Sequence, residues 1–156
     1  MGVQLIFVVE ANKSCKSDWI YIKSTIDYFY EYNRTGLKLS PVYMDGKGKY
    51  KQKEKEVKSL ISQYSKVSKG NKSKVIYCLD CDECDSKSED LTFLKTVKKY
   101  CDDRGYDFIW FCKDVEQVYI GKRVDKSQKK NESTKFKKNN LITKVDVHRL
   151  SGRDYR

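Results

Sequence analysis

The sequence predicts an α/β fold, in which a central four-stranded, mostly parallel β-sheet lies between two layers of helices. Two features lead to this prediction. Short apolar segments alternate with amphipathic helical segments along most of the chain, and the connections between them are short. The first and third apolar segments are nearly continuous hydrophobic runs, as in strands that are buried on both faces of a sheet. Regular alternation of strands and helices is typical of a parallel sheet in a three-layer sandwich.

Four strands are predicted, over residues 3–9, 37–44, 74–79 and 106–111. The first is rich in β-branched residues and is followed directly by Glu10. The second contains Pro41, the only proline of the chain, which indicates an edge strand or a bulge. The third is again apolar and is followed directly by Asp80.

Three main helices are predicted over residues 17–33, 50–68 and 88–104, and a short fourth helix over 114–120. Apolar residues recur in them every three to four positions, which is the period of an amphipathic helix. Ser17 is expected to cap the first helix, and Gly105 to end the third. The inward-facing residues expected in the third helix are Leu91, Leu94, Val97 and Cys101.

The composition of the chain changes near residue 121. Residues 1–121 are expected to form the α/β domain, and 122–156 a basic C-terminal extension that adds a strand over 141–150 or is partly flexible. From Gly121 onward there are 12 Lys and Arg against 4 Asp and Glu, which accounts for +8 of the total charge of +11. This balance favours a polyanion such as RNA or DNA, although a solvated Lys-rich surface is the simpler alternative.

The N-terminal residues predict a cytoplasmic protein without membrane association. Residues 3–9 are too short to span a bilayer, and neither a basic n-region nor a cleavage site flanks them. The six cysteines are therefore expected to be reduced. Zinc or an iron–sulfur cluster could use the spacing of Cys78, Cys81 and Cys84, with Cys101 or Cys112 as fourth ligand. A strand followed by a turn does not naturally converge the three sulfur atoms, so this site is the weaker hypothesis.

Acidic residues follow two of the predicted strands. Glu10 and Asp80 come directly after them, and Asp82 lies two residues further on. Ligands of parallel α/β sheets bind beyond the carboxyl ends of the strands, where these residues are expected to meet. Crowded carboxylates repel each other unless a cation neutralises them, and their hard oxygen atoms select Mg²⁺ or Mn²⁺. These three acids are the candidate metal-binding and catalytic residues; the alternative is that they only end strands and cap helices.

Lysines near the same edge and in the tail are candidate contacts to nucleic-acid phosphate. Some follow strand ends, some lie in the glycine-containing loop 45–49, and some lie in the basic tail. They are Lys13, Lys47, Lys49, Lys113, Lys129 and Lys130. Ordinary solvated surface lysines are the alternative interpretation for each of them.

A strand ending at Glu10 and a later strand ending at Asp80-Cys81-Asp82 resemble the Toprim domain of topoisomerases, bacterial primases and small nucleases, over about residues 3–121. The chain is most similar to the free-standing Toprim-like proteins of phage defence, the RloB-like and abortive-infection groups. Those proteins often carry a further acid after the fourth strand, and Glu116 is the matching candidate here. The family usually has glycine after the first Glu, where this chain has Ala11.

The resemblance implies a Toprim-like, Rossmann-like domain that hydrolyses phosphodiester bonds in RNA or DNA with Mg²⁺ or Mn²⁺, as a toxic effector of phage defence. Asp80 and Asp82 would bind the metal, and Glu10 would bind metal or act as the general acid/base. A non-catalytic nucleic-acid-binding or partner-binding module is the alternative, and Ala11 is its best support. A response-regulator-like receiver phosphorylated at Asp80 would want an acidic pair after the first strand, which Glu10-Ala11 does not supply. A regulatory partner, such as an ATPase or sensor protein, and the oligomeric state remain open.

Overall fold

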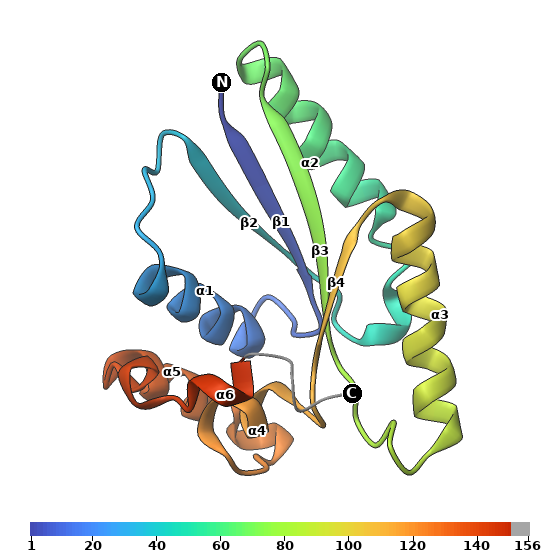
Figure 1. Cartoon of the computed structure of the whole chain (residues 1–156), viewed down its shortest axis with the longest axis vertical. Helices are drawn as coiled ribbons and strands as arrows, with labels where there is room; N and C mark the ends of the chain where they lie inside the picture. The colour runs from blue at the N-terminus through green and yellow to red at the C-terminus, as the bar shows by residue number, and fades with distance from the viewer. Residues whose placement is uncertain (151–156) are drawn as a thin grey trace.

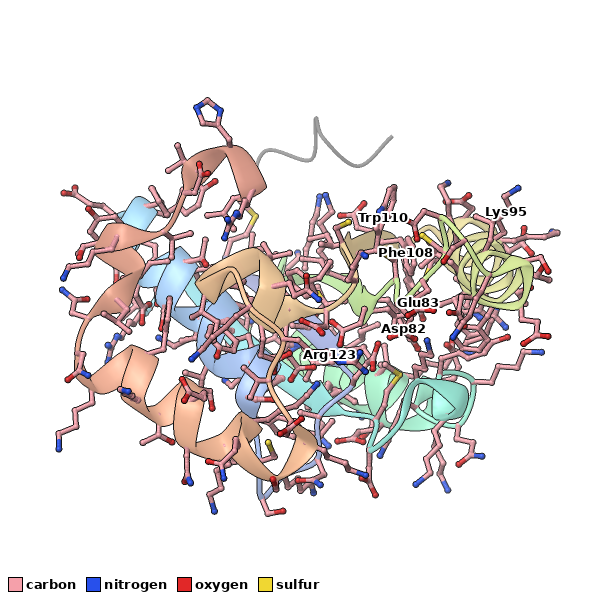
Figure 2. All side chains as sticks on the ribbon, turned by 90° about the horizontal axis from the view of Figure 1, so that it is seen from below. Asp82, Glu83, Lys95, Phe108, Trp110 and Arg123 are labelled. Atoms are coloured by element: carbon pink, nitrogen blue, oxygen red, sulfur yellow. The ribbon has the colours of Figure 1, made fainter. Side chains whose placement is uncertain are left out.

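A parallel β-sheet forms the centre of the computed structural model, which describes residues 1–150 (Figure 1). Within these residues the sheet has four strands in the order β2-β1-β3-β4, and every neighbouring pair is parallel. The strands are β1 (Val3–Val9), β2 (Leu37–Tyr43), β3 (Lys72–Asp80) and β4 (Asp107–Phe111). The predicted fold class is therefore confirmed. Because the strands are parallel, they all end on one side of the molecule, which Figure 2 shows from below.

Helices cover both faces of the sheet, as expected for a three-layer sandwich (Figure 1). One face carries α2 (Glu54–Val67) and α3 (Ser88–Arg104). The other face carries α1 (Ser17–Phe29), α4 (Val115–Ile120), α5 (Lys129–Lys138) and α6 (Val147–Leu150). Single 3₁₀ turns lie at η1 (Lys47–Lys49), η2 (Lys126–Gln128) and η3 (Leu141–Lys144). None of the helices within residues 1–150 is long and apolar enough to cross a membrane.

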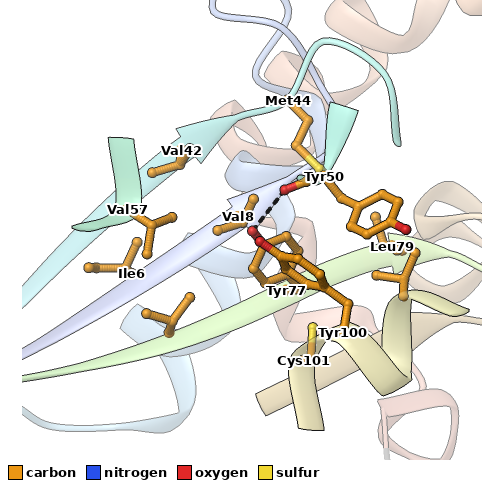
Figure 3. Close-up of a cluster of buried hydrophobic side chains, with 12 residues drawn as sticks. Ile6, Val8, Val42, Met44, Tyr50, Val57, Tyr77, Leu79, Tyr100 and Cys101 are labelled. Atoms are coloured by element: carbon orange, nitrogen blue, oxygen red, sulfur yellow. Dashed lines mark hydrogen bonds between the residues drawn. The ribbon is translucent and has the colours of Figure 1, made fainter. Parts of the chain in front are cut away.

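Alternate residues of β1 point into two separate hydrophobic cores. Ile6 and Val8 pack with residues of α2 and α3, whereas Phe7 and Val9 pack with residues of α1, α4 and α5. In the first core the Tyr77 hydroxyl donates a hydrogen bond of 3.0 Å to the backbone carbonyl of Tyr50, which satisfies a buried polar group (Figure 3). Because both faces of β1 are buried, its sequence does not alternate between polar and apolar residues.

The ends of several elements differ from the prediction. The first helix ends at Phe29, and the second begins at Glu54 rather than residue 50. Ser17 is not a cap, because Lys16 precedes the helix in a left-handed conformation and no side chain caps the helix start. In α3, Leu91 is 36% exposed instead of facing inward. Pro41 lies on the edge strand β2, as its lack of an N–H donor requires.

The basic tail packs onto the second core and adds no strand within residues 122–150. The prediction of a strand over residues 141–150 is wrong, since this segment forms η3 and α6. Phe136 of α5 is buried, and its ring centroid lies 4.9 Å from that of Tyr21 and 5.9 Å from that of Tyr119. Ile142 of η3 is buried in the same core. These apolar residues cover α1 and α4 more effectively as helical turns than they could by extending a sheet edge.

Candidate active site

A cleft of about 390 Å³ opens where β1, β2 and β3 end, at the edge predicted from the strand order. Acidic residues from four segments line it, together with two lysines of the tail. The charged residues of its wall are Glu10, Asp18, Asp45, Asp80, Lys126 and Lys129. The cleft therefore brings the acids after the strands together with the beginning of the basic tail.

Glu10 and Asp80 form the centre of this cleft. The Asp80 backbone N–H donates a hydrogen bond of 2.7 Å to Glu10 Oε1, and the Val115 N–H donates one of 2.9 Å to Asp80 Oδ1. These bonds join the ends of β1 and β3 to the start of α4. Each carboxylate holds a backbone donor with one of its oxygen atoms, and both residues line the cleft.

Burial is the main influence on the charge of this pair. It raises the pKa of Glu10 to about 7, against the lowering effects of the Asp80 N–H and of Lys47. Burial also raises the pKa of Asp80 well above its usual range, and the charges of Glu10 and Glu116 add to the increase. Burial and the neighbouring acids thus favour the protonated forms of this pair, and a bound cation would favour the charged forms.

Asp82 lines a different pocket from the one that Glu10 and Asp80 line. It has a left-handed backbone conformation (φ 51°), and its carboxylate pairs with Lys47. Its backbone N–H donates a hydrogen bond of 2.8 Å to the carbonyl of Lys113. Asp82 lines a neighbouring pocket with Glu83 and Arg123, and Figure 2 shows these three residues close together. The structure therefore brings together two of the three predicted acids, while Asp82 acts on Glu10 only through its charge.

Asp18 is a site residue that the candidate residues of the sequence analysis did not include. It is 6% exposed and lines the cleft. Its Oδ2 atom accepts a hydrogen bond of 3.1 Å from the Ala11 N–H, and its Oδ1 atom accepts one of 3.0 Å from its neighbour Trp19. Burial raises the pKa of Asp18 despite these bonds.

The turn after Glu10 does not need glycine. Among residues 1–150, the non-glycine residues with positive φ angles do not include Ala11. The Ala11 N–H is held by Asp18, so the backbone after β1 has its own anchor. The alanine at this position is therefore compatible with the geometry of the cleft.

Glu116 is the most deeply buried acid near the site, with no exposed surface. Within the described residues neither of its carboxylate oxygen atoms accepts a hydrogen bond, although Lys129 Nζ lies 3.3 Å from Oε2. Burial raises the pKa of Glu116, partly offset by Lys129. Burial alone would lower the pKa of Lys129, but the charges of Glu116 and Asp80 raise it overall. The buried carboxylate of Glu116 and the half-buried ammonium group of Lys129 thus form an ion pair close enough to Asp80 to act on its charge.

The predicted lysines are spread over several locations. Lys129 lines the cleft, as does Lys126, which sequence reasoning did not select. Lys47 pairs with Asp82, and Lys49 Nζ lies 3.5 Å from an Asp45 carboxylate oxygen. Lys113 lies in the neighbouring pocket, while Lys13 and Lys130 are exposed. Of the six predicted lysines, Lys129 alone lines the cleft within residues 1–150.

The cleft offers the kind of oxygen ligands that a divalent cation prefers, although its side chains are not arranged around a cation. Across residues 1–150, no group of three or more His, Cys, Asp or Glu side chains is already arranged to hold a metal. The cleft nevertheless contains the carboxylates of Glu10 and Asp80, each with one oxygen atom held by a backbone N–H, and Glu116 pairs with Lys129 beside them. Carboxylate oxygen atoms are the ligands that Mg²⁺ and Mn²⁺ prefer.

Comparison with known proteins identifies no relative of this chain. No protein family, curated protein or solved structure matches it. The functional inference therefore depends on the residues of the cleft and on their chemistry.

Proposed function

We propose that the protein is a Mg²⁺- or Mn²⁺-dependent nuclease that hydrolyses phosphodiester bonds in RNA or DNA within this cleft. The observation that carries the proposal is the pair of Glu10 and Asp80, two hydrogen-bonded acids in an open cleft at the carboxyl edge of a parallel sheet. The net charge of +11 favours a polyanionic substrate. The resemblance to Toprim-like proteins of phage defence suggests an effector role, under the control of a sensor or ATPase partner.

The residues of the cleft divide the work as follows. Asp80 would hold the cation, and Glu10 Oε2 would either join it or carry a proton, while Glu116 stays paired with Lys129 beside the cleft. A bound divalent ion would supply Lewis acidity, which activates water and neutralises charge on the phosphate. The pKa of about 7 suits Glu10 to proton transfer at neutral pH, with Oε1 held by the Asp80 N–H. Lys126 and Lys129 would attract the phosphate backbone at the rim.

The test is cleavage of labelled RNA, single-stranded DNA and duplex DNA by purified protein with Mg²⁺, Mn²⁺ or EDTA. Asp80→Asn preserves an acceptor for the Val115 N–H and removes the charge, so cleavage should fall by about 100-fold or more. Asp107→Asn is the matched control, because Asp107 is half-exposed at the start of β4 and pairs with Lys74. Equal cleavage by wild type and Asp80→Asn would overturn the proposal.

A non-catalytic nucleic-acid-binding module is the second candidate. The pairing of Asp82 with Lys47 supports it, since this ion pair removes one expected ligand from the cleft. This candidate predicts that RNA or DNA binds with the same affinity in Mg²⁺ and in EDTA, and that no substrate is cleaved. The same set of assays therefore separates the two functions.

A further inference from the structure

Three of the six cysteines gather at the ends of β3 and β4, next to the cleft. Cys81 follows β3, Cys84 lies three residues later, and Cys112 follows β4. The Cys81 thiol interacts with the thiols of both Cys84 and Cys112. Cys78 and Cys101, by contrast, are buried in the two separate hydrophobic cores. The cluster therefore differs from the four-cysteine metal site considered from the spacing alone.

Hydrogen bonds from backbone N–H groups join the segments that carry these three cysteines. The Cys84 N–H donates a bond of 3.2 Å to the Cys81 carbonyl, which closes a four-residue turn. The Cys81 N–H donates to the Phe111 carbonyl at 2.9 Å, and the Lys113 N–H donates to Cys81 Sγ at 3.1 Å. Cys81 is thus held by the backbone on both sides of Cys112.

We propose that this cluster is an oxidation site, in which peroxide converts Cys81 and Cys84 into a disulfide. The turn brings the two Cα atoms within about 7 Å, and disulfides span Cα distances of about 4.4–6.8 Å. Cys84 is half-buried and open to small oxidants, whereas Cys81 is 4% exposed. The accessible thiol therefore reacts first, and the buried thiol resolves it.

The chemistry needs hydrogen peroxide and no other reactant. The Cys84 sulfur attacks the O–O bond, so it is oxidised to a sulfenic acid while the leaving hydroxide takes up the thiol proton as water. The Cys81 sulfur then displaces the hydroxyl group from Cys84, which leaves with the Cys81 proton as a second water. Two thiols and one peroxide thus give one disulfide and two waters, and a dithiol reverses the reaction.

Disulfide formation would also affect the cleft, because the turn between the two cysteines contains Asp82 and directly follows Asp80. The bond would draw Cys81 Sγ away from the Lys113 N–H and constrain the segment that holds Asp82 against Lys47. We expect oxidised protein to cleave nucleic acid more slowly and a dithiol to restore the rate. This effect rests on the proposed function, whereas the disulfide itself does not.

Peptide mapping tests the disulfide directly. The folded protein is treated with hydrogen peroxide, its remaining thiols are blocked with N-ethylmaleimide, and it is digested without reduction by trypsin and a glutamate-specific protease. Cleavage after Glu83 separates Cys81 from Cys84, so peptides 75–83 and 84–87 stay together only through a disulfide. Fragmentation spectra distinguish Cys81 from Cys78 within the first peptide.

The linked peptides should form in wild type, disappear in Cys84→Ser and persist in Cys15→Ser, which replaces an isolated half-buried thiol. Linkage to Cys112, or no linkage at all, would overturn the proposed pairing. If peroxide slows nucleic-acid cleavage by wild type but not by Cys84→Ser, the result supports the link between the disulfide and the cleft. A disulfide that forms without changing cleavage overturns only that link. Protein that never cleaves but forms the disulfide refutes the proposed function and leaves the oxidation site standing.

Discussion

Replacing Glu10 with glutamine should make the metal-free protein more stable at pH 8, although it removes a residue of the proposed site. Burial holds the pKa of Glu10 at about 7, so its charged form is unfavourable in the folded protein. Glutamine has no charge to bury, and its amide oxygen can still accept the hydrogen bond from the Asp80 N–H. Sites that bind cations often reduce stability in this way until the cation arrives.

The sign and size of the effect follow from proton linkage. The folded state binds the Glu10 proton more tightly, so the contribution of Glu10 to stability is greatest below pH 4.5 and falls as the pH rises to about 7. A pKa that rises from 4.5 to about 7 corresponds to roughly 3 kcal/mol. The glutamine variant avoids this loss but buries an extra amide group, and we expect a net gain of about 2 kcal/mol at pH 8.

Urea unfolding in EDTA between pH 4 and pH 8, followed by tryptophan fluorescence, measures this difference. Asp18 and Glu116 also have raised pKa values that wild type and variant share, so subtraction isolates Glu10 together with its electrostatic coupling to Asp80. Mg²⁺ should stabilise wild type at pH 8, and a smaller stabilisation of Glu10→Gln would show that Glu10 joins Asp80 in holding the cation. Parallel stability profiles for the two proteins in EDTA would refute the reasoning.

Glu54→Gln is the control of opposite sign. Burial acts to raise the pKa of Glu54, but hydrogen bonds from the Tyr100 and Tyr106 hydroxyls outweigh it and lower the pKa. Its charge therefore stabilises the folded protein above pH 4.5, and this contribution is lost as the pH falls through the lowered value. Glutamine at position 54 should reduce stability at neutral pH, in contrast to glutamine at position 10.

Three further substitutions test other parts of the structure. Lys129→Met leaves the buried Glu116 carboxylate without its counter-charge, so the free energy of unfolding at pH 7 should fall by about 3 kcal/mol. The control Lys130→Met replaces an exposed lysine and should change this free energy by less than about 0.5 kcal/mol. Phe136→Ala removes a buried ring from the core of α1 and α4 and should cost about 3–5 kcal/mol in the same urea assay. Asp82→Asn should retain metal-dependent cleavage within about tenfold, since Asp82 pairs with Lys47 outside the cleft; a loss as large as that of Asp80→Asn would return Asp82 to the metal site.

The sheet and the meeting of Glu10 with Asp80 were predictable because both depend on the direction of the chain. Parallel strands must end on the same side, so residues that follow two neighbouring strands share an edge. The position of Asp82 depends instead on one backbone angle, the positive φ that turns its side chain toward Lys47. Hydrophobic patterns do not encode a backbone angle. Glycine and asparagine are the residues that most often indicate a positive φ, and this position has Asp82 instead.

Asp18 and Phe136 escaped prediction for a different reason. An aspartate in the first turn of a helix usually meets solvent, and Asp18 is buried only because the left-handed Lys16 leads the helix back to Ala11. Phe136 is a single ring in a segment of lysines, which by composition looks solvated. Its partners, Tyr21 and Tyr119, lie far away in sequence, so tertiary contacts decide its burial.

Burial of Phe136 also explains how a lysine of the tail reaches the acids of the cleft. The ring holds α5 against α1, and the first residue of α5 is Lys129, whose ammonium group lies 3.3 Å from Glu116. The packing of the Phe136 ring thus helps to position the ammonium group of Lys129. The other lysines of α5 stay largely exposed, where they act on a polyanion through long-range attraction that salt screens. High salt should therefore weaken nucleic-acid binding, while the Glu116–Lys129 pair, whose carboxylate is fully buried, persists.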